Sequence, residues 1–267
     1  MGGLARRASY IRKKAADGLP VLVVDAGGFA HRGARSKLKT RFLLEAYHRI
    51  GYQAVNLSEA DLRLGPEFLR KAAADWNVPF VTCNLRQANG EPLDFAKPYR
   101  IVRPWGPEGP AVGIFGVSIV SLPVFGQAPP QWWTKDDPVA AAKSVVSELK
   151  DKCDLIVALA YATDSQAQQF LRQVPGVDLV VAGRSTYRLR GPWKSQWGIV
   201  CVVGTQGKYI GEAVLRRTDS GDWEVAGGEL RALDKQVGED PEIKKLVQEY
   251  KNALKQAVKQ TPAPAGR

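Results

Sequence analysis

Histidine is scarce in this sequence of 267 residues, and this limits the chemistry that the chain can support. There are only two histidines. His31 follows an Ala-Gly-Gly-Phe segment and is a candidate for contact with a ligand, whereas His48 lies in a helical pattern and is expected at the surface. A metal site that uses several imidazoles cannot be built from these two residues.

The cysteines do not point to a metal site either. Cys83, Cys153 and Cys201 are three in number, so they cannot all pair, and their spacing matches no zinc motif. All three lie within or just before apolar strand patterns. We therefore expect buried thiols.

Two adjacent aromatic residues, Trp132 and Trp133, lie in a Pro-rich segment that is predicted to form a long loop over residues 121–136. Neighbouring aromatic side chains in such a loop could form a patch that docks a protein partner. They could equally fold back over the sheet. The sequence leaves both interpretations open.

Positive charge is concentrated at the start of the chain. Residues 1–50 hold eleven Lys and Arg against three acidic residues, which accounts for +8 of the net charge of +11. Such a surface attracts nucleic acid, anionic lipid headgroups or an acidic partner. However, the basic residues are not interleaved with aromatic residues as in nucleic-acid platforms, so solvated helix faces are favoured and nucleic acid is not.

No apolar run approaches the roughly 18 residues needed to span a bilayer. As written, the chain is expected to be soluble. It begins abruptly at "MGGLARR", which is typical of the start of a helix, and we expect that upstream sequence is missing.

Hydrophobic periodicity and Gly/Pro positions predict the elements that must position these residues. Helices are expected over residues 4–18, 36–51, 65–77, 136–152, 165–174 and 240–258. Strands are expected over residues 19–27, 52–58, 78–85, 99–106, 111–120, 154–161, 178–184, 198–204, 209–217 and 223–233.

The order of these elements is βα repeats first and a more β-rich second half. This order favours two stacked sheets flanked by helices over a simple doubly wound fold. There is no internal repeat and no convincing linker. We predict one domain over residues 1–258 and a disordered tail over residues 259–267.

Several segments resemble motifs of one family, in the correct order. "VVDAGGF" (23–29) is similar to an Asp-Ala-Gly-Asp-x-Phe motif, and "LSEADLRLG" (57–65) keeps the frame of Leu-Gly-Asn-His-Asp/Glu-Phe. "DLIVALAY" (154–161) resembles the strand leading to Leu-Ser-His, and "VPGVDLVVAGRSTY" (174–187) stands where a Gly-His-Ser-His is expected. The chain thus resembles the calcineurin-like metallophosphoesterases, specifically the catalytic domain of the 5'-nucleotidase group.

That resemblance implies an α/β fold, a four-layer αββα sandwich of two stacked mixed sheets flanked by helices, without its first strand. It also implies two-metal hydrolysis of phosphate esters, in which paired divalent ions activate a water and neutralise the phosphate. The metal motifs are degenerate, however. The positions that match ligand or catalytic residues of the family carry Gly28, Glu59, Ala60, Tyr161, Arg184 and Thr186.

These replacements predict a remodelled pocket with no catalytic residue and no metal. In the preferred interpretation, Arg184 forms an ion pair with Glu59 across the former site. In the alternative, Arg184 binds an anionic ligand, because its guanidinium suits phosphate geometry. Helpers in that alternative would be Tyr161, Thr186, Arg35 and Lys37.

Three functions follow from these observations. The preferred one is a catalytically inactive, metal-free binding or structural module with a protein partner and no cofactor. The second is a phosphoesterase whose Mn or Zn pair is held by a rebuilt site, and the third is a binder of nucleic acid or anionic surfaces. The family resemblance also suggests an exported or periplasmic protein if an N-terminal leader has been removed.

Overall fold

The computed structural model describes residues 2–30, 33–120, 132–184, 190–204 and 206–259. Seven helices lie in this part of the chain: α1 (Leu4–Ala16), α2 (Ser36–Ile50), α3 (Glu59–Leu62), α4 (Pro66–Asp75), α5 (Pro138–Leu149), α6 (Asp164–Gln173) and α7 (Pro241–Lys259). The predicted helices are therefore confirmed, and the short helix α3 was not predicted.

The described strands are β1 (Val24–Asp25), β2 (Ala54–Asn56), β3 (Phe80–Val81), β4 (Leu85–Gln87), β5 (Tyr99–Val102), β6 (Val112–Ser118), β7 (Trp133–Lys135), β8 (Leu155–Tyr161), β9 (Leu179–Ala182), β10 (Trp193–Lys194), β11 (Ile199–Val202), β12 (Tyr209–Gly211), β13 (Val214–Arg217), β14 (Trp223–Gly227) and β15 (Leu230–Ala232). A long loop was predicted over residues 121–136. Its end instead forms β7, which pairs antiparallel with β4, and residues 121–131 lie outside the described part.

The strands form several sheets, and two of these sheets stack on each other. One has the order β1-β2-β3 and is parallel, and the other has the order β10-β11-β9-β8-β6-β5 and is mixed. Strands β6 and β8 are buried along their whole length, as expected for strands covered on both faces. β12 with β15 and β13 with β14 form further two-stranded ladders.

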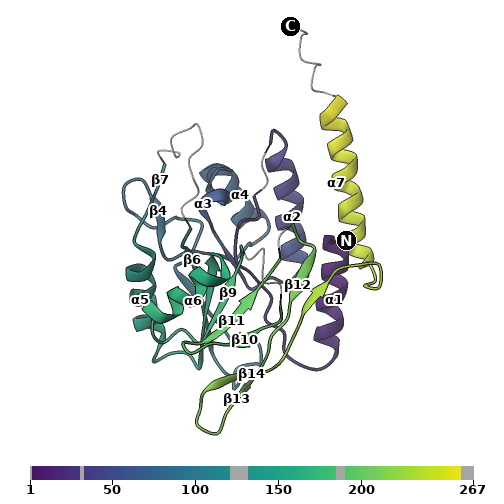
Figure 1. Cartoon of the computed structure of the whole chain (residues 1–267). Helices are drawn as coiled ribbons and strands as arrows, with labels where there is room; N and C mark the ends of the chain where they lie inside the picture. Colours follow the sequence, from purple (N-terminus) through teal and green to yellow (C-terminus); the bar gives the residue numbers. More distant parts are fainter. Residues whose placement is uncertain (1, 31–32, 121–131, 185–189, 205, 260–267) are drawn as a thin grey trace.

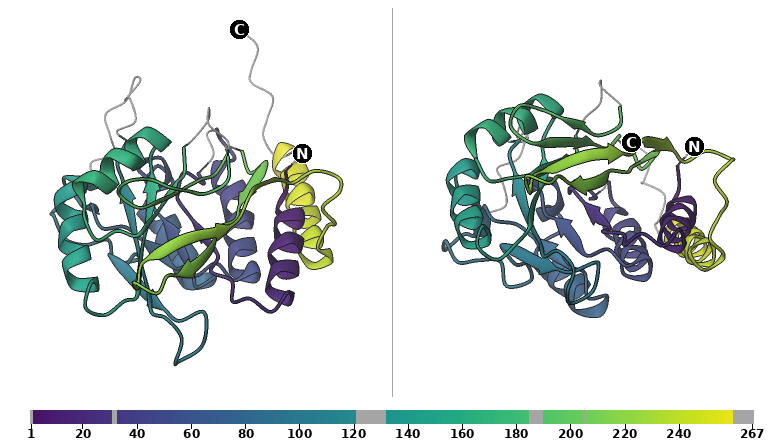
Figure 2. Two further views of the ribbon diagram at one scale, coloured as in Figure 1. Left: turned by 60° about the horizontal axis from the view of Figure 1, so that its bottom comes forward. Right: turned by 90° about the horizontal axis from the view of Figure 1, so that it is seen from below.

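Three hydrophobic clusters fill the spaces between four layers. One cluster packs α1, α2, α4 and α7 on the three-stranded sheet, a second packs α5 and α6 on the six-stranded sheet, and the third lies between the sheets. Figures 1 and 2 show α5 and α6 on one side of the strands and α1, α2 and α7 on the other. The αββα sandwich is confirmed.

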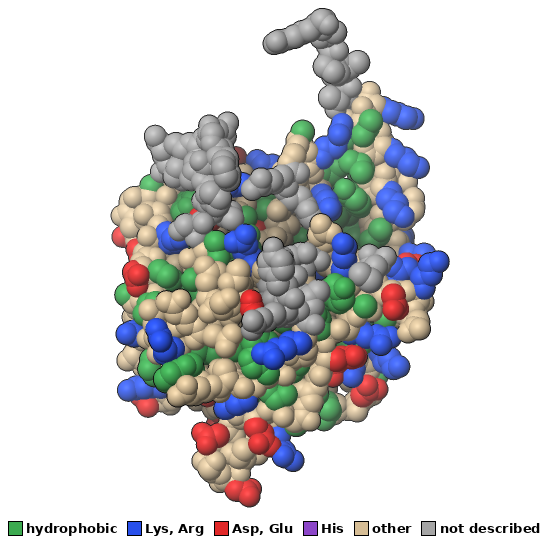
Figure 3. Space-filling view, viewed as in Figure 1, with side chains coloured by type: hydrophobic (Ala, Val, Ile, Leu, Met, Phe, Trp, Pro, Cys, Tyr) green, Lys and Arg blue, Asp and Glu red, His purple; other side chains and the backbone are tan. Residues whose placement is uncertain are grey.

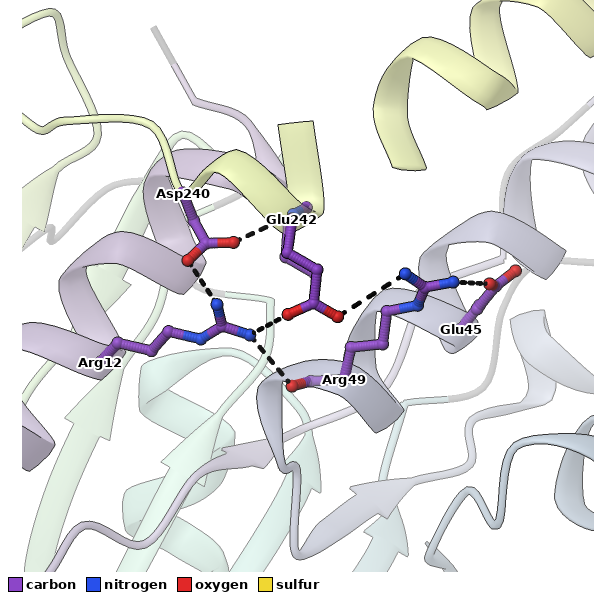
Figure 4. A network of polar contacts seen from close by, with 6 residues as sticks. Arg12, Glu45, Arg49, Asp240 and Glu242 are labelled. Carbon is purple, nitrogen blue, oxygen red and sulfur yellow. Dashed lines mark hydrogen bonds and ion pairs between the residues drawn. The ribbon is translucent and has the colours of Figure 1, made fainter. Parts of the chain in front are cut away.

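Helix α7 is held against α1 and α2 by a polar network as well as by apolar contact. Arg12 donates to Asp240 at 2.5 Å and to Glu242 at 2.7 Å, and Arg49 reaches Glu242 and Glu45 (Figure 4). In the space-filling view, Lys and Arg side chains follow the outer side of α7 and hydrophobic side chains line its inner side (Figure 3). Several basic residues of the N-terminal half are thus paired within the fold.

No helix among the described residues is both long and apolar enough to cross a membrane.

Candidate functional site

The loop after β1 and the end of β8 meet at one place. Gly28 has a φ of +77°, a conformation that L side chains rarely adopt, and it faces the ring of Tyr161. A Cβ built on Gly28 would lie 2.4 Å from Cε2 of Tyr161. The ring therefore occupies the space into which any side chain at position 28 would project.

Arg184 also contacts the Tyr161 ring. Its guanidinium carbon lies 5.3 Å from the centroid of the Tyr161 ring, which is within the range of a cation–π contact. The loop that carries Arg184 is fixed by its backbone N–H, which donates to the carbonyl of Ala162 at 3.0 Å. The Tyr161 ring thus contacts both Gly28 and the Arg184 guanidinium.

The pairing expected between Glu59 and Arg184 is not present in this structure. Glu59 is 9% exposed and forms its ion pair with Lys135 of β7. No carboxylate lies within ion-pair distance of Arg184 in the described ranges. The sequence could not identify Lys135 as the partner, because it lies at the end of a segment that had been predicted as loop.

The segment "SEAD" (58–61) has a structural role, which its last residue carries. Asp61 is fully buried and accepts the N–H of Gly28 at 2.8 Å and the N–H of Ala30 at 2.7 Å. It also accepts the N–H and the hydroxyl of Ser58, and its bond with the Ser58 N–H is one half of the capping box of α3. One carboxylate therefore ties the loop after β1 to the start of α3.

Burial raises the pKa of Asp61 to about 6, and these hydrogen bonds to its charged form only partly oppose the effect. The carboxylate thus has two properties at once. Its hydrogen bonds hold the loop after β1 against the start of α3, and it gains a proton in mildly acidic solution.

A second polar cluster near the site was not predicted from the sequence. Arg7 donates to the hydroxyls of Tyr47 and Tyr52, at 3.2 Å and 3.1 Å, and the Tyr47 hydroxyl donates to Asp25 at 2.7 Å. The two tyrosine rings stack with centroids 4.0 Å apart. Arg7 follows Leu4 by three residues and precedes Ile11 by four, so it occupies the apolar stripe of α1. A charged residue at this position was the signal in the sequence that could have indicated a buried polar cluster.

The charges in this cluster are balanced. Burial alone would lower the pKa of Arg7, but the hydroxyls of Tyr52 and Tyr47 together with Asp25 outweigh burial and raise it. Burial raises the pKa of both tyrosines, so both hydroxyls remain neutral. The tyrosine hydroxyls and Asp25 thus stabilise the charged guanidinium of Arg7 inside the fold.

The remaining predicted residues lie as follows. His48 is exposed, as expected. Trp132 and Trp133 are half-buried and pack against the cluster under α1, α2, α4 and α7, as one of the two interpretations of the sequence expected. His31 and Thr186 lie outside the described residues.

A pair of divalent ions does not fit the residues at this place. A ligand side chain at position 28 would collide with the Tyr161 ring, and Gly28, Ala60 and Arg184 offer no side-chain atom that binds a cation. Throughout the described part of the chain, no three His, Cys, Asp or Glu side chains are grouped so that they could hold a metal ion.

No protein-family model matches the chain. The snake venom 5'-nucleotidase of Gloydius brevicauda is 27% identical over 277 residues, covering 95% of this chain and 46% of that protein. The chain thus spans about half the length of the curated relatives it matches.

Solved structures share the fold. The 5'-nucleotidase precursor from Thermus thermophilus has a TM-score of 0.79 at 23% identity, covering 97% of this chain and 54% of that one. The calcineurin-like phosphoesterase YfkN from Bacillus subtilis has a TM-score of 0.73 at 18% identity, covering 97% and 91%. In sequence the chain is thus similar to 5'-nucleotidases, and its fold is shared with 5'-nucleotidase and calcineurin-like phosphoesterase structures.

Proposed function

We propose that this domain is a metal-free, catalytically inactive member of its group that serves as a binding or structural module for a protein partner. The observation that carries the proposal is the Tyr161 ring, which contacts Arg184 and occupies the space in front of Gly28. These three residues match ligand positions of the family, and the side chains of Tyr161 and Arg184 place an aromatic ring and a cation at the former site.

The replacement is balanced electrostatically. Removing two divalent ions from a set of carboxylates would leave buried negative charge, which is costly. Here a glycine stands at the position of the bridging carboxylate, and the acid at position 59 is paired with Lys135. Because these replacements leave no unpaired carboxylate at positions 28 and 59, no metal ion is needed there to compensate buried negative charge.

An anionic ligand is a second use of the same residues. Arg184 is half-buried and lines a cavity of about 1280 Å³ that Gly28 also lines, where it is accessible to a small anion. The Arg184 guanidinium suits a carboxylate or phosphate. We propose this ligand as an addition to the binding module and not as a substrate.

Nucleic-acid binding by the N-terminal half has less support. Arg6, Arg12, Lys14 and Arg49 all form ion pairs with acids of the same chain, and these pairs reduce the charge available to phosphates. Export from the cytoplasm is supported by the names of two relatives, a venom protein and a precursor.

The proposal is tested by assaying phosphate-ester hydrolysis with p-nitrophenyl phosphate and adenosine 5'-monophosphate in the presence of Mn²⁺ or Zn²⁺. We expect no metal-dependent turnover by the parent chain. Tyr161→Ala and Arg184→Ala serve as controls, because a contaminating phosphatase would be equally active in all three preparations. Turnover in the parent that both variants lose would overturn the proposal.

A further inference from the structure

Asparagine is scarce in this chain, and only one asparagine is followed by glycine. Asn89 precedes Gly90, whereas the other four asparagines precede Leu, Val, Leu and Ala; these are Asn56, Asn77, Asn84 and Asn252. In an Asn-Gly pair, the backbone nitrogen of the glycine can attack the side-chain carbonyl carbon of the asparagine. A Cβ on the second residue would shield that nitrogen, and glycine has none.

The Asn-Gly pair lies in an exposed turn that follows β4. Asn89 and Gly90 are both exposed. The turn is closed by the N–H of Gln87, which donates to the carbonyl of Glu91 at 2.8 Å. Gly90 has a φ of +86°, and a Cβ built there would meet no described atom within 4 Å. Water therefore reaches both reacting residues.

The side chain of Asn89 is folded back over the backbone that follows it. Its Oδ1 accepts the N–H of Glu91 at 3.1 Å. This hydrogen bond closes a ring that contains both Cγ of Asn89 and the backbone nitrogen of Gly90, so the two reacting atoms are held close together. The same N–H lies where negative charge develops on Oδ1 during the attack, and a fixed donor at that place lowers the barrier.

One contact opposes the reaction. The N–H of Gly90 donates to the carbonyl of Gln87 at 2.9 Å, and this proton must leave before the nitrogen can attack. A single backbone hydrogen bond contributes little net free energy, so it slows the attack by about fivefold and does not prevent it.

We propose that Asn89 is a site of spontaneous covalent modification in the folded chain, which converts it into aspartate and isoaspartate through a cyclic imide. The backbone nitrogen of Gly90 loses its proton and bonds to Cγ of Asn89. The bond from Cγ to Nδ2 breaks, and Nδ2 leaves with that proton as ammonia. Water, the only co-reactant, then opens the imide at one of its two carbonyl carbons. Opening at Cγ gives aspartate, and opening at the main-chain carbonyl gives isoaspartate.

The products change the charge and the backbone of this turn. Both place a carboxylate two residues from Glu91, and isoaspartate also inserts the Cβ of residue 89 into the main chain. The turn lies at the end of the β4–β7 ladder, where the N–H of Ala88 donates to the carbonyl of Trp132 at 3.0 Å. The modification therefore acts at the end of the ladder that carries Lys135, the partner of Glu59.

The proposal is tested by incubating the intact chain at pH 8.5 and 37 °C, beside a synthetic peptide of residues 85–94 in the same buffer. Peptide mapping by mass spectrometry measures conversion at each asparagine, and fragmentation distinguishes isoaspartate from aspartate. We expect Asn89 of the folded chain to convert within about fivefold of the rate of the peptide, with isoaspartate among the products. The other asparagines should stay intact.

Two variants with matched backbone strain serve as controls. Gly90→Ala should slow conversion by about tenfold, because its Cβ shields the attacking nitrogen. Gly106→Ala places the same strain in another turn, since Gly106 has a φ of +88° and also has space for a Cβ, and it should leave the rate at Asn89 unchanged.

An unconverted Asn89 in the folded chain would overturn the proposal, and conversion of the peptide alone would assign the protection to the fold. Aspartate without isoaspartate, or equal rates in the parent and in Gly90→Ala, would overturn the route through a cyclic imide.

Discussion

Gly28 and the ring of Tyr161 are in direct steric contact, since a Cβ at position 28 would lie 2.4 Å from Cε2 of Tyr161. The two residues come from a loop and a strand end that are 133 positions apart in the chain. The identity of each therefore depends on the other. A carboxylate cannot return to position 28 while the tyrosine is present.

The first prediction concerns this dependence. Gly28→Ala should lower the free energy of unfolding by about 2–4 kcal/mol, because it combines an unfavourable positive φ with overpacking against the ring. In a Tyr161→Ala background the clash is absent, and the same substitution should cost about 1 kcal/mol. Urea unfolding of the four proteins of this double-mutant cycle measures the coupling.

A coupling free energy near zero would show that the two side-chain positions are independent. The Tyr161→Ala variant alone also loses apolar burial, so only the difference between the two Gly28→Ala effects is informative.

The second prediction concerns Asp61 and pH. The unfolded carboxyl titrates near its usual pKa, whereas burial raises the folded pKa to about 6, so the folded state binds more protons between these two values. The free energy of unfolding should therefore fall as the pH rises through this window, by about 2–3 kcal/mol in total from this group.

Asp61→Asn should remove this dependence, because the amide does not titrate. At neutral pH it should also cost about 1–3 kcal/mol, since an amide group cannot accept all the N–H groups that Asp61 accepts. Chemical unfolding of both proteins at several pH values between 4 and 7.5 tests this. A parent and a variant with parallel pH profiles would contradict the assignment to Asp61.

The third prediction separates the two stacked tyrosines. Tyr47→Phe removes the hydroxyl that donates to Asp25, so it should lower the free energy of unfolding by about 1–3 kcal/mol. Tyr52→Phe removes only an acceptor of the Arg7 guanidinium, which retains the hydroxyl of Tyr47, so it should cost about 1 kcal/mol or less. Equal losses in thermal or urea unfolding would argue against a distinct role for the Tyr47–Asp25 hydrogen bond.

Much of the fold was predictable from sequence because local pattern and layer packing agree. The apolar stripe of α1 and the Gly51 that ends α2 in a left-handed conformation mark helix bounds directly. The antiparallel pair β5–β6 also followed from the Pro/Gly turn between its strands. The β1 segment was predicted as a nine-residue strand, but only Val24 and Asp25 form a ladder, since strand length depends on a neighbour and not on the segment alone.

The candidate site was less predictable. The motif positions predicted that Gly28, Tyr161 and Arg184 lie close together, because the segments that carry them keep the order and spacing of the family's motifs. Side-chain partners did not follow, since Lys135 reaches Glu59 from β7, and Asp61 reaches Gly28 across 33 positions. Such contacts depend on packing between distant segments, and a single sequence contains no direct signal for them.

The central claim is that this domain holds no metal pair, and metal stoichiometry tests it most directly. The purified chain is incubated with excess Mn²⁺ and Zn²⁺ and desalted, and bound metal per chain is measured by mass spectrometry, beside an Arg184→His, Thr186→His variant. We predict near-zero stoichiometry for the parent chain. Close to two ions per parent chain would contradict the claim.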